Sequence, residues 1–221
     1  MKLAILANGQ QKEEWLAKPQ GQEVKIKWVN NRKELLDSGA EAFFDLLFQP
    51  ENTAYPYSKL NAPLFIHDVT YPFRSNSSFA NISETGFPLF RMNAWPTFLK
   101  REIVELSAFN KKDESTGGQL ISALGWKYKF VADIPGLITA RVVAMIINEA
   151  YFTLEQEVST KEEIDVAMKL GTNYPYGPFE WSEIIGLQHI YQLLIEMSKS
   201  DKKYEPCQLL QKEAGQQLTW H

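Results

Sequence analysis

The chain has 221 residues, of which 44% are hydrophobic and 23% are charged, and its formal net charge is −4. These values are typical of a folded globular protein with one large domain or two small ones, and they disfavour a nucleic-acid-binding surface. The single cysteine, Cys207, excludes an internal disulfide framework. We find no signal-peptide pattern and no apolar run of the ~18 residues that a membrane helix needs, so we expect a cytoplasmic protein without a membrane partner.

The first part of the chain alternates short apolar runs with polar or helical stretches. The apolar run at 2–7 is typical of a buried parallel strand, and the run at 23–29 alternates apolar and polar residues. The expected strands lie at 2–7, 23–29, 41–48, 64–69, 87–93, 102–106 and 129–132, with helices at 10–18 and 116–124. Strands that alternate with helices in this way predict a parallel sheet with helices on its faces.

The second part is predicted to be all-α, and it begins at the segment Asp-Ile-Pro-Gly, 133–136. Apolar residues at a helical period predict a long helix at 137–154, with an apolar face so wide that we expect both sides to be covered. A capping box at 159–162 opens a second helix, which Gly171 closes. Further helices are expected at 182–197, with a break near Gly186, and at 208–218. We therefore divide the chain into domains 1–132 and 133–221.

Three segments of the second domain carry a family signature. They read D-I-P-G-L-I-T-A-R at 133–141, T-K-E-E-I-D-V-A-M-K-L-G at 160–171 and Y-P-Y-G-P-F-E-W at 174–181. In this order and spacing they resemble the C-terminal helical domain of 3-hydroxyacyl-CoA dehydrogenases. The resemblance implies a Rossmann-like NAD-binding domain followed by a helical domain through which two subunits form a homodimer.

The first domain resembles the same family more faintly, at 3–12, 21–28 and 40–73. The long helical arm that the family carries between the last two segments is almost absent from this chain. Its absence accounts for the short α/β domain. Since the arm lies near the acyl-CoA in the family, its absence also weakens the case for an acyl-CoA substrate.

The positions that bind NAD in the family are largely changed here. The three glycines of its G-x-G-x-x-G turn fall on Ala7, Gly9 and Lys12, and the acidic ribose-binding residue falls on Trp28. An indole cannot accept hydrogen bonds from ribose hydroxyls, and we expect Lys12 to obstruct the close approach of helix and strand. We therefore predict that the chain holds no cofactor, with Gly9 and its neighbour Asn8 as the remaining candidates for an NAD contact.

The family's catalytic histidine and glutamate, which lie twelve residues apart, fall on Asn93 and Glu105. Asparagine donates hydrogen bonds but cannot shuttle a proton near neutral pH. General acid–base catalysis contributes roughly 10²–10⁴-fold to a rate, and the resemblance implies that this contribution is missing. Glu105 remains a candidate catalytic carboxylate, and the alternative is a solvated carboxylate at a strand edge.

Three further positions bear on the chemistry. Thr70 falls on the family's substrate-binding serine, while Ala140 replaces a polar asparagine beside the retained Arg141. His67, at an expected strand end, is the interior candidate for a substitute proton carrier. Thr70 and His67 can equally be structural residues of a strand end. No spacing of His, Cys, Asp or Glu indicates a metal site.

Two hypotheses remain open at this point. In the first, the chain is a non-catalytic, dimeric relative that keeps the family's fold and binds an acyl-CoA-like ligand, regulates a partner or serves as a scaffold. In the second, it is an active NAD(P)-dependent 3-hydroxyacyl-CoA dehydrogenase of fatty-acid metabolism with a rearranged site, and His67 replaces the lost histidine. Binding of NADH discriminates between them.

Overall fold

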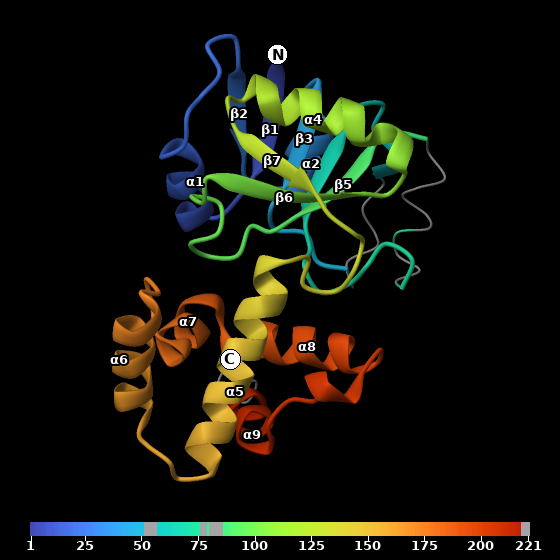
Figure 1. Cartoon of the computed structure of the whole chain (residues 1–221). Helices are drawn as coiled ribbons and strands as arrows, with labels where there is room; N and C mark the ends of the chain where they lie inside the picture. Colours follow the sequence, from blue (N-terminus) through green and yellow to red (C-terminus); the bar gives the residue numbers. More distant parts are fainter. Residues whose placement is uncertain (51–56, 76–78, 80–85, 218–221) are drawn as a thin grey trace. The chain divides into compact units, whose positions relative to one another are not determined.

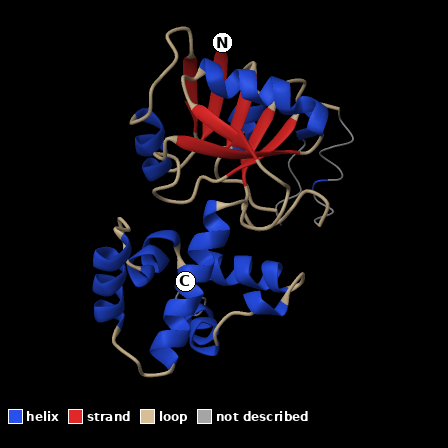
Figure 2. Cartoon of the chain, viewed as in Figure 1, coloured by secondary structure: helices blue, strands red, loops and turns tan. Residues whose placement is uncertain are grey.

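The computed structural model describes residues 1–50, 57–75, 79 and 86–217 (Figure 1). It divides the chain into two compact units, Met1–Leu137 and Ile138–His221. The first unit combines a sheet with helices, and the described part of the second contains helices and connecting segments (Figure 2). The predicted fold class, a Rossmann-like α/β domain followed by an all-α domain, is confirmed.

The first unit, or α/β unit, is built on a seven-stranded sheet of order β2-β1-β3-β4-β5-β6-β7. The strands are β1 (Lys2–Leu6), β2 (Lys25–Val29), β3 (Ala42–Asp45), β4 (Leu64–His67), β5 (Leu89–Met92), β6 (Ile103–Ala108) and β7 (Lys127–Phe130). All seven correspond to predicted strands. β1 to β5 are parallel, but β6 is antiparallel to β5, and β7 is parallel to β6. The expectation of a fully parallel sheet was wrong there, because the connection at 93–102 is too short for a crossover helix.

The sequence of each strand matches its place in the sheet. The central strands β1 and β3 read KLAIL and AFFD and are almost entirely buried. The two edge strands read KIKWV and KYKF, and their lysines, Lys25, Lys27, Lys127 and Lys129, are exposed. Charged side chains on an edge strand discourage pairing with another chain, so both edges of this sheet are protected.

Each face of the sheet has its own hydrophobic core. On one face, Trp15 of α1 (Gly9–Leu16) and Ile121 of α4 (Glu114–Ala123) pack on a row of stacked phenylalanines that crosses β3, β4 and β5. The ring centroids of this row are 4.5 Å apart between Phe44 and Phe65 and 4.6 Å apart between Phe65 and Phe90. The opposite face carries Leu35 of α2 (Arg32–Leu36), a short helix that we did not predict. The packed cores hold the sheet in place from both sides. They leave the carboxyl ends of the strands, where ligands bind in folds of this class.

The second unit, or helical unit, is organised around α5 (Thr139–Glu155), which packs against three other helices. The helices that follow are α6 (Lys161–Thr172), α7 (Pro178–Ile185), α8 (Leu187–Ser198) and α9 (Gln208–Gln217). The helix predicted at 182–197 is two helices, α7 and α8, which meet at Gly186 with φ at +95°. The capping box of α6 pairs Thr160 with Glu163, one residue later than predicted, and Asn173 at φ +57° closes the helix in place of Gly171.

The signature segments at 160–171 and 174–181 form one helix–helix joint. The Asp165 carboxylate on α6 accepts hydrogen bonds from the backbone N–H groups of Phe179, at 2.8 Å, and Glu180, at 3.1 Å, and so caps α7. Lys169 of α6 also forms an ion pair with Glu180. A Cβ atom added at Gly177 would lie 2.3 Å from Cγ of Asp165. The glycine and the aspartate of the signature are therefore required together, for packing.

Candidate functional site

In an open parallel sheet, ligands bind outside the carboxyl ends of the strands, where successive connections leave a strand in opposite directions. Here that point lies between β1 and β3, because β2 and β3 flank β1 on opposite sides. The strand ends meet closely there, since the Leu46 N–H donates to the Leu6 carbonyl oxygen at 2.9 Å. The helix α1 begins at the same edge. A dinucleotide bound in the usual manner of this fold would meet the start of α1.

The start of α1 is capped by its own side chains. Oδ1 of Asn8 accepts from the Gln11 N–H at 2.8 Å, and Oε1 of Gln11 accepts from the Asn8 N–H at 3.1 Å. This capping box takes up two of the backbone donors that a pyrophosphate uses in dinucleotide-binding folds. A Cβ atom added at Gly9 would meet nothing within 4 Å, so no close backbone approach requires a glycine there. Of the two candidate NAD contacts, Asn8 caps the helix and Gly9 faces open space.

The Gln11 side chain continues from this cap across the carboxyl edge of the sheet. Its Nε2 donates to the Leu46 carbonyl oxygen at 3.0 Å and to the Ala94 carbonyl oxygen at 3.2 Å. Leu46 follows β3 and Ala94 follows β5, so one carboxamide ties together two segments far apart in the sequence. Gln11 is only 5% exposed. The sequence contained a signal for the cap, the spacing N-x-x-Q, but none for the wider reach of this side chain.

Lys12 and Trp28, the altered glycine and ribose positions, contact one another. Nζ of Lys12 lies 5.2 Å from the centroid of the Trp28 ring, which is a cation–π contact. Lys12 is exposed, and α1 packs on the sheet through Gln11, Glu14 and Trp15. The expectation that Lys12 obstructs the helix–strand approach was wrong, because its side chain is exposed and reaches the ring of Trp28 on the edge strand β2. With a capped helix start, a buried glutamine at the edge and an indole at the ribose position, the residues present do not fit NAD.

Asn93 and Glu105 are brought opposite one another by the sheet. The β5–β6 register pairs Arg91 with Ser107 and Met92 with Leu106, so its continuation places Asn93 across from Glu105 on one face. Asn93 is 5% exposed and Glu105 is 8% exposed. The alternative that Glu105 is a solvated carboxylate was therefore wrong. Oδ1 of Asn93 accepts from the Trp95 N–H at 3.0 Å, so the amide braces the turn after β5.

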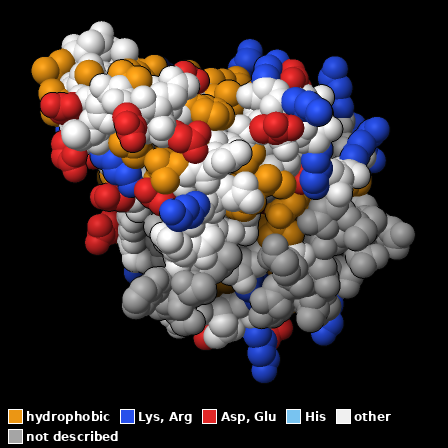
Figure 3. Space-filling view, turned by 90° about the horizontal axis from the view of Figure 1, so that it is seen from below, with side chains coloured by type: hydrophobic (Ala, Val, Ile, Leu, Met, Phe, Trp, Pro, Cys, Tyr) orange, Lys and Arg blue, Asp and Glu red, His pale blue; other side chains and the backbone are white. Residues whose placement is uncertain are grey.

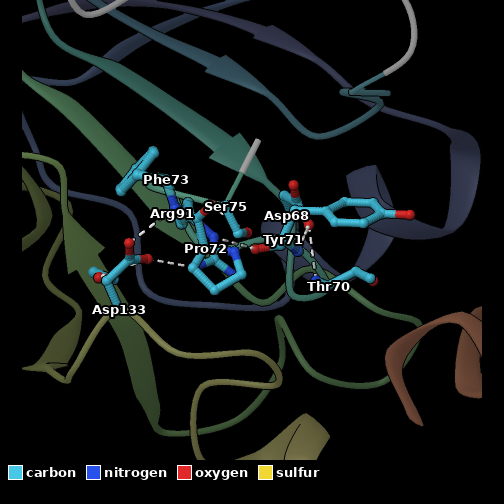
Figure 4. Close-up of polar contacts among 9 residues, drawn as sticks. Asp68, Thr70, Tyr71, Pro72, Phe73, Ser75, Arg91 and Asp133 are labelled. Carbon is cyan, nitrogen blue, oxygen red and sulfur yellow. Dashed lines mark hydrogen bonds and ion pairs between the residues drawn. The ribbon is translucent and has the colours of Figure 1, made fainter. Parts of the chain in front are cut away.

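His67 and Thr70 lie at the carboxyl end of β4. Nδ1 of His67 accepts from the Ala94 N–H at 3.0 Å and lies 3.3 Å from the Met92 carbonyl oxygen. This contact places the proton of the neutral ring on Nε2 and links the ends of β4 and β5. The backbone N–H groups of Thr70 and Tyr71 donate to Oδ1 of Asp68 at 2.8 Å and 3.0 Å (Figure 4). The turn that holds Thr70 is thus formed by Asp68.

A buried ion pair, which we did not predict, anchors this turn. Arg91 on β5 is fully buried, pairs with Asp133 and donates from Nε to the Asp68 carbonyl oxygen at 3.0 Å (Figure 4). The second carboxylate oxygen of Asp133 accepts from the Phe73 N–H at 2.8 Å. The first residue of the D-I-P-G motif therefore holds the segment after β4 against the sheet. The charged residue inside the apolar strand LFRM was the available signal, because a buried guanidinium requires a partner.

A second buried network closes the carboxyl end of β3. Asp45 is fully buried, and it accepts from Nε of Arg32 at 2.7 Å and from the Tyr57 hydroxyl at 2.6 Å. Burial raises the pKa of Tyr57, and the Asp45 carboxylate raises it further. The Leu47 N–H donates to the other Asp45 oxygen at 3.1 Å. Asp45 thus organises the chain after β3 through contacts within the protein.

Other predicted positions lie elsewhere. Ala140 belongs to the helical unit, where it is fully buried on α5, and the Arg141 guanidinium lies 4.3 Å from the centroid of the Tyr204 ring. Within the described ranges no group of three or more His, Cys, Asp or Glu residues is placed to hold a metal ion. None of the helices that the structure describes is long and apolar enough to cross a membrane.

A Rossmann-like sheet followed by a helical unit defines the class of two-domain dehydrogenase folds, and sequence comparison narrows the class. Residues 136–217 match the family "3-hydroxyacyl-CoA dehydrogenase, C-terminal domain". The chain is 45% identical over 86 residues to 3-hydroxyadipyl-CoA dehydrogenase of Escherichia coli. The matched segment covers 38% of this chain and 18% of that protein. It is 40% identical over 122 residues to 3-hydroxybutyryl-CoA dehydrogenase of Bradyrhizobium diazoefficiens, covering 52% and 41%.

The fold as a whole is similar to the crystal structure of M. tuberculosis FadB2, with a TM-score of 0.75 and 16% identity over 97% of this chain and 94% of that one. The matched segments span less than half of the two curated relatives. The match at 136–217 identifies the helical unit as a 3-hydroxyacyl-CoA dehydrogenase C-terminal domain, and the rest of the chain shares the fold of the similar structures.

Proposed function

We propose that this chain is a non-catalytic member of its family, one that binds no NAD and acts as a ligand-binding protein or scaffold. The observation that carries the proposal is the buried Gln11 carboxamide, which spans from the segment after β3 to the segment after β5. A ligand at the switch point would have to displace this side chain and leave two buried carbonyl oxygens without their donor. Each such loss costs about 1–3 kcal/mol, which opposes cofactor binding.

The residues opposite Glu105 and at the end of β4 support the same proposal. Asn93 occupies the position from which a histidine would exchange a proton, and an amide cannot do so near neutral pH. His67 uses Nδ1 to accept from the Ala94 N–H at 3.0 Å, which ties it to the backbone. Both observations support a chain that does not exchange a proton with a substrate at this edge.

Calorimetric titration of the purified protein with NADH tests this proposal, with an active dehydrogenase of the family as the positive control. We expect no heat of binding at millimolar NADH. A dissociation constant below roughly 100 μM, about 5.5 kcal/mol of binding free energy, would contradict the proposal. Titration with acetoacetyl-CoA alone then examines the ligand-binding role, since an acyl-CoA-like ligand needs no nicotinamide for binding.

An active NAD(P)-dependent dehydrogenase is the second candidate, and the facing positions of Asn93 and Glu105 favour it. Exchanging Asn93 for histidine restores a histidine–glutamate pair at these positions. If the cofactor binds, Asn93→His should raise the rate of acetoacetyl-CoA reduction, and His67→Ala should abolish any activity of the unaltered chain. Under our proposal both variants and the parent chain are inactive, because no hydride donor is held.

We further propose that the helical unit forms a homodimer, as the family resemblance implies. The wide apolar face of α5 does not itself require a second copy, because α7, α8 and α9 pack against it. Support comes instead from α6, where Val166 is 51% exposed and Leu170, one turn later, is 83% exposed. Figure 3 shows a face of the molecule on which apolar side chains lie exposed among charged ones.

Light scattering after size-exclusion chromatography tests the dimer. We expect a dimer for the parent chain and a monomer for the Val166→Lys/Leu170→Lys variant. Thr172→Lys, on the last residue of the same helix, serves as the matched control and should remain dimeric. A parent chain that is monomeric at all concentrations would contradict the dimer and leave the proposal on NAD untouched.

A further inference from the structure

The segment 94–101, which we call the strap, connects β5 to β6 and lies along α1. Two side chains of α1, Gln11 and Glu14, and the side chain of Lys18, two residues beyond the end of the helix, each bind the backbone of the strap. Their partners are Ala94, Thr97 and Arg101. The steps between them are three and four residues in the segment 11–18 and again three and four on the strap. The matching spacing aligns the strap with α1 and with the turn that follows it.

All three contacts are shielded from water. Gln11 is 5% exposed, and Glu14 and Lys18 are each 8% exposed. The Thr97 N–H donates to Oε1 of Glu14 at 2.5 Å, and Nζ of Lys18 donates to the Arg101 carbonyl oxygen. Burial lowers the pKa of Lys18 from its ordinary value. A buried carboxylate or ammonium costs free energy unless it is hydrogen-bonded, so these two side chains stabilise the closed strap only while they keep these partners.

The strap also carries backbone strain. Thr97 has φ at +75°, in the left-handed region that a β-branched residue rarely adopts. Such a conformation persists only where the surroundings impose it, and the hydrogen bond from the Thr97 N–H to Glu14 is the contact that holds it. The neighbouring Trp95, Phe98 and Leu99 are buried, at 4%, 4% and 1% exposed. The contacts with α1 therefore hold the strap in a backbone conformation that Thr97 would not adopt by itself.

We propose that α1 and the strap form an intramolecular latch that closes the carboxyl edge of the sheet, so that the protein occludes its own ligand crevice. This inference deepens the proposed function and rests on it, because it adds that access is blocked as well as that cofactor contacts are lost. Gln11 belongs to both features, since the same Nε2 binds Leu46 at the switch point and Ala94 at the start of the strap. Any ligand that enters this edge must first release the strap from α1.

Amide hydrogen exchange read by mass spectrometry tests the latch. The variant Glu14→Gln removes the charged acceptor of the Thr97 N–H, and Glu13→Gln, at the exposed neighbouring residue of α1, is the matched control. We expect exchange over 95–101 to accelerate at least about tenfold in Glu14→Gln, and β1, β5 and α4 to keep the exchange of the parent chain. Glu13→Gln should exchange like the parent chain everywhere.

Equal exchange of the strap in both variants, or a strap that already exchanges in the parent chain as fast as an unfolded peptide, would overturn the latch. If Glu14→Gln does not fold, Lys18→Met replaces it, because this variant keeps the apolar stem and removes only the contact with Arg101. The same acceleration, confined to the strap, is expected there. Binding of NADH by the parent chain would contradict the proposed function, whereas the strap's exchange rates judge the latch by themselves.

Discussion

The two units of this chain use the positions of the family signature differently. In the helical unit, those positions contact one another: Asp165 caps α7, and Gly177 leaves the room that Asp165 occupies. In the α/β unit, positions that serve a cofactor in the family are engaged in contacts within the protein, as Lys12 and Trp28 show. A signature position required for packing is thus independent of the ligand. A position required only for the ligand is free to take another role.

The largest expected effect concerns the ion pair between buried Arg91 and Asp133 in the α/β unit. Replacing Asp133 by alanine leaves the fully buried Arg91 guanidinium without its carboxylate, which should lower the free energy of unfolding by about 3–5 kcal/mol. Urea denaturation measures the change. The control is Glu102→Gln in the exposed pair with Lys127, where we expect no measurable change. A loss below ~1 kcal/mol for Asp133→Ala would show that this motif position is not structural.

The next largest effect concerns the joint between α6 and α7 in the helical unit. The methyl group of Gly177→Ala would overlap the Asp165 carboxylate and displace the cap of α7, which should cost about 1–3 kcal/mol. Gly171→Ala on α6 is the matched control, because its added Cβ meets nothing within 4 Å. This control should be neutral or stabilise the helix by up to about 1 kcal/mol. If both variants unfold alike in a thermal scan, the packing explanation of the signature fails.

A smaller effect concerns how the stability of each unit depends on pH, through one buried tyrosine in each. Tyr57→Phe removes the hydroxyl donor to buried Asp45, which keeps Arg32 as a partner, and should cost on the order of 1 kcal/mol at neutral pH. The pKa of Tyr57 is raised in the folded state, mainly by burial. Above about pH 10 the unfolded chain loses the phenol proton while the folded chain retains it, so stability falls as pH rises.

We therefore expect the free energy of unfolding of Tyr57→Phe to fall less steeply above about pH 10 than that of the parent chain. Denaturant titrations at several alkaline pH values measure the two slopes. Burial also raises the pKa of Tyr151 in the helical unit, so Tyr151→Phe gives the corresponding slope for that unit. Identical slopes for Tyr57→Phe and the parent chain would contradict a buried phenol at position 57.

For Gly9→Ala we expect no measurable change in the free energy of unfolding. Gly9→Ala places a Cβ where nothing lies within 4 Å, at the first residue of α1. We expect the free energy of unfolding to stay within ~0.5 kcal/mol of the parent value, since no close approach depends on the glycine. In a working dinucleotide site the same glycine admits the pyrophosphate. A large loss of stability, or a change in any NADH titration, would show that Gly9 has kept a role.

The sequence predicted elements better than contacts between them. An apolar or alternating run predicted each strand. The antiparallel direction of β6 follows from the short connection at 93–102, which no such run indicates. The break at Gly186 was visible as a glycine, but α2, with five residues, was too short for a periodic pattern. The capping box of Asn8 and Gln11 is readable from spacing. The Gln11 contacts with Leu46 and Ala94 span 35 and 83 residues, and no local pattern encodes them.

NMR titration with NADH examines whether a dinucleotide reaches the carboxyl edge that Gln11 and the strap are proposed to close. The backbone amide signals of Asn8, Gln11 and Thr97 report on the cap, the edge and the strap. We expect none of them to shift up to millimolar NADH. Saturable shifts of these three signals, with the helical unit unaffected, would show that a dinucleotide enters this edge and that the protein does not occlude it.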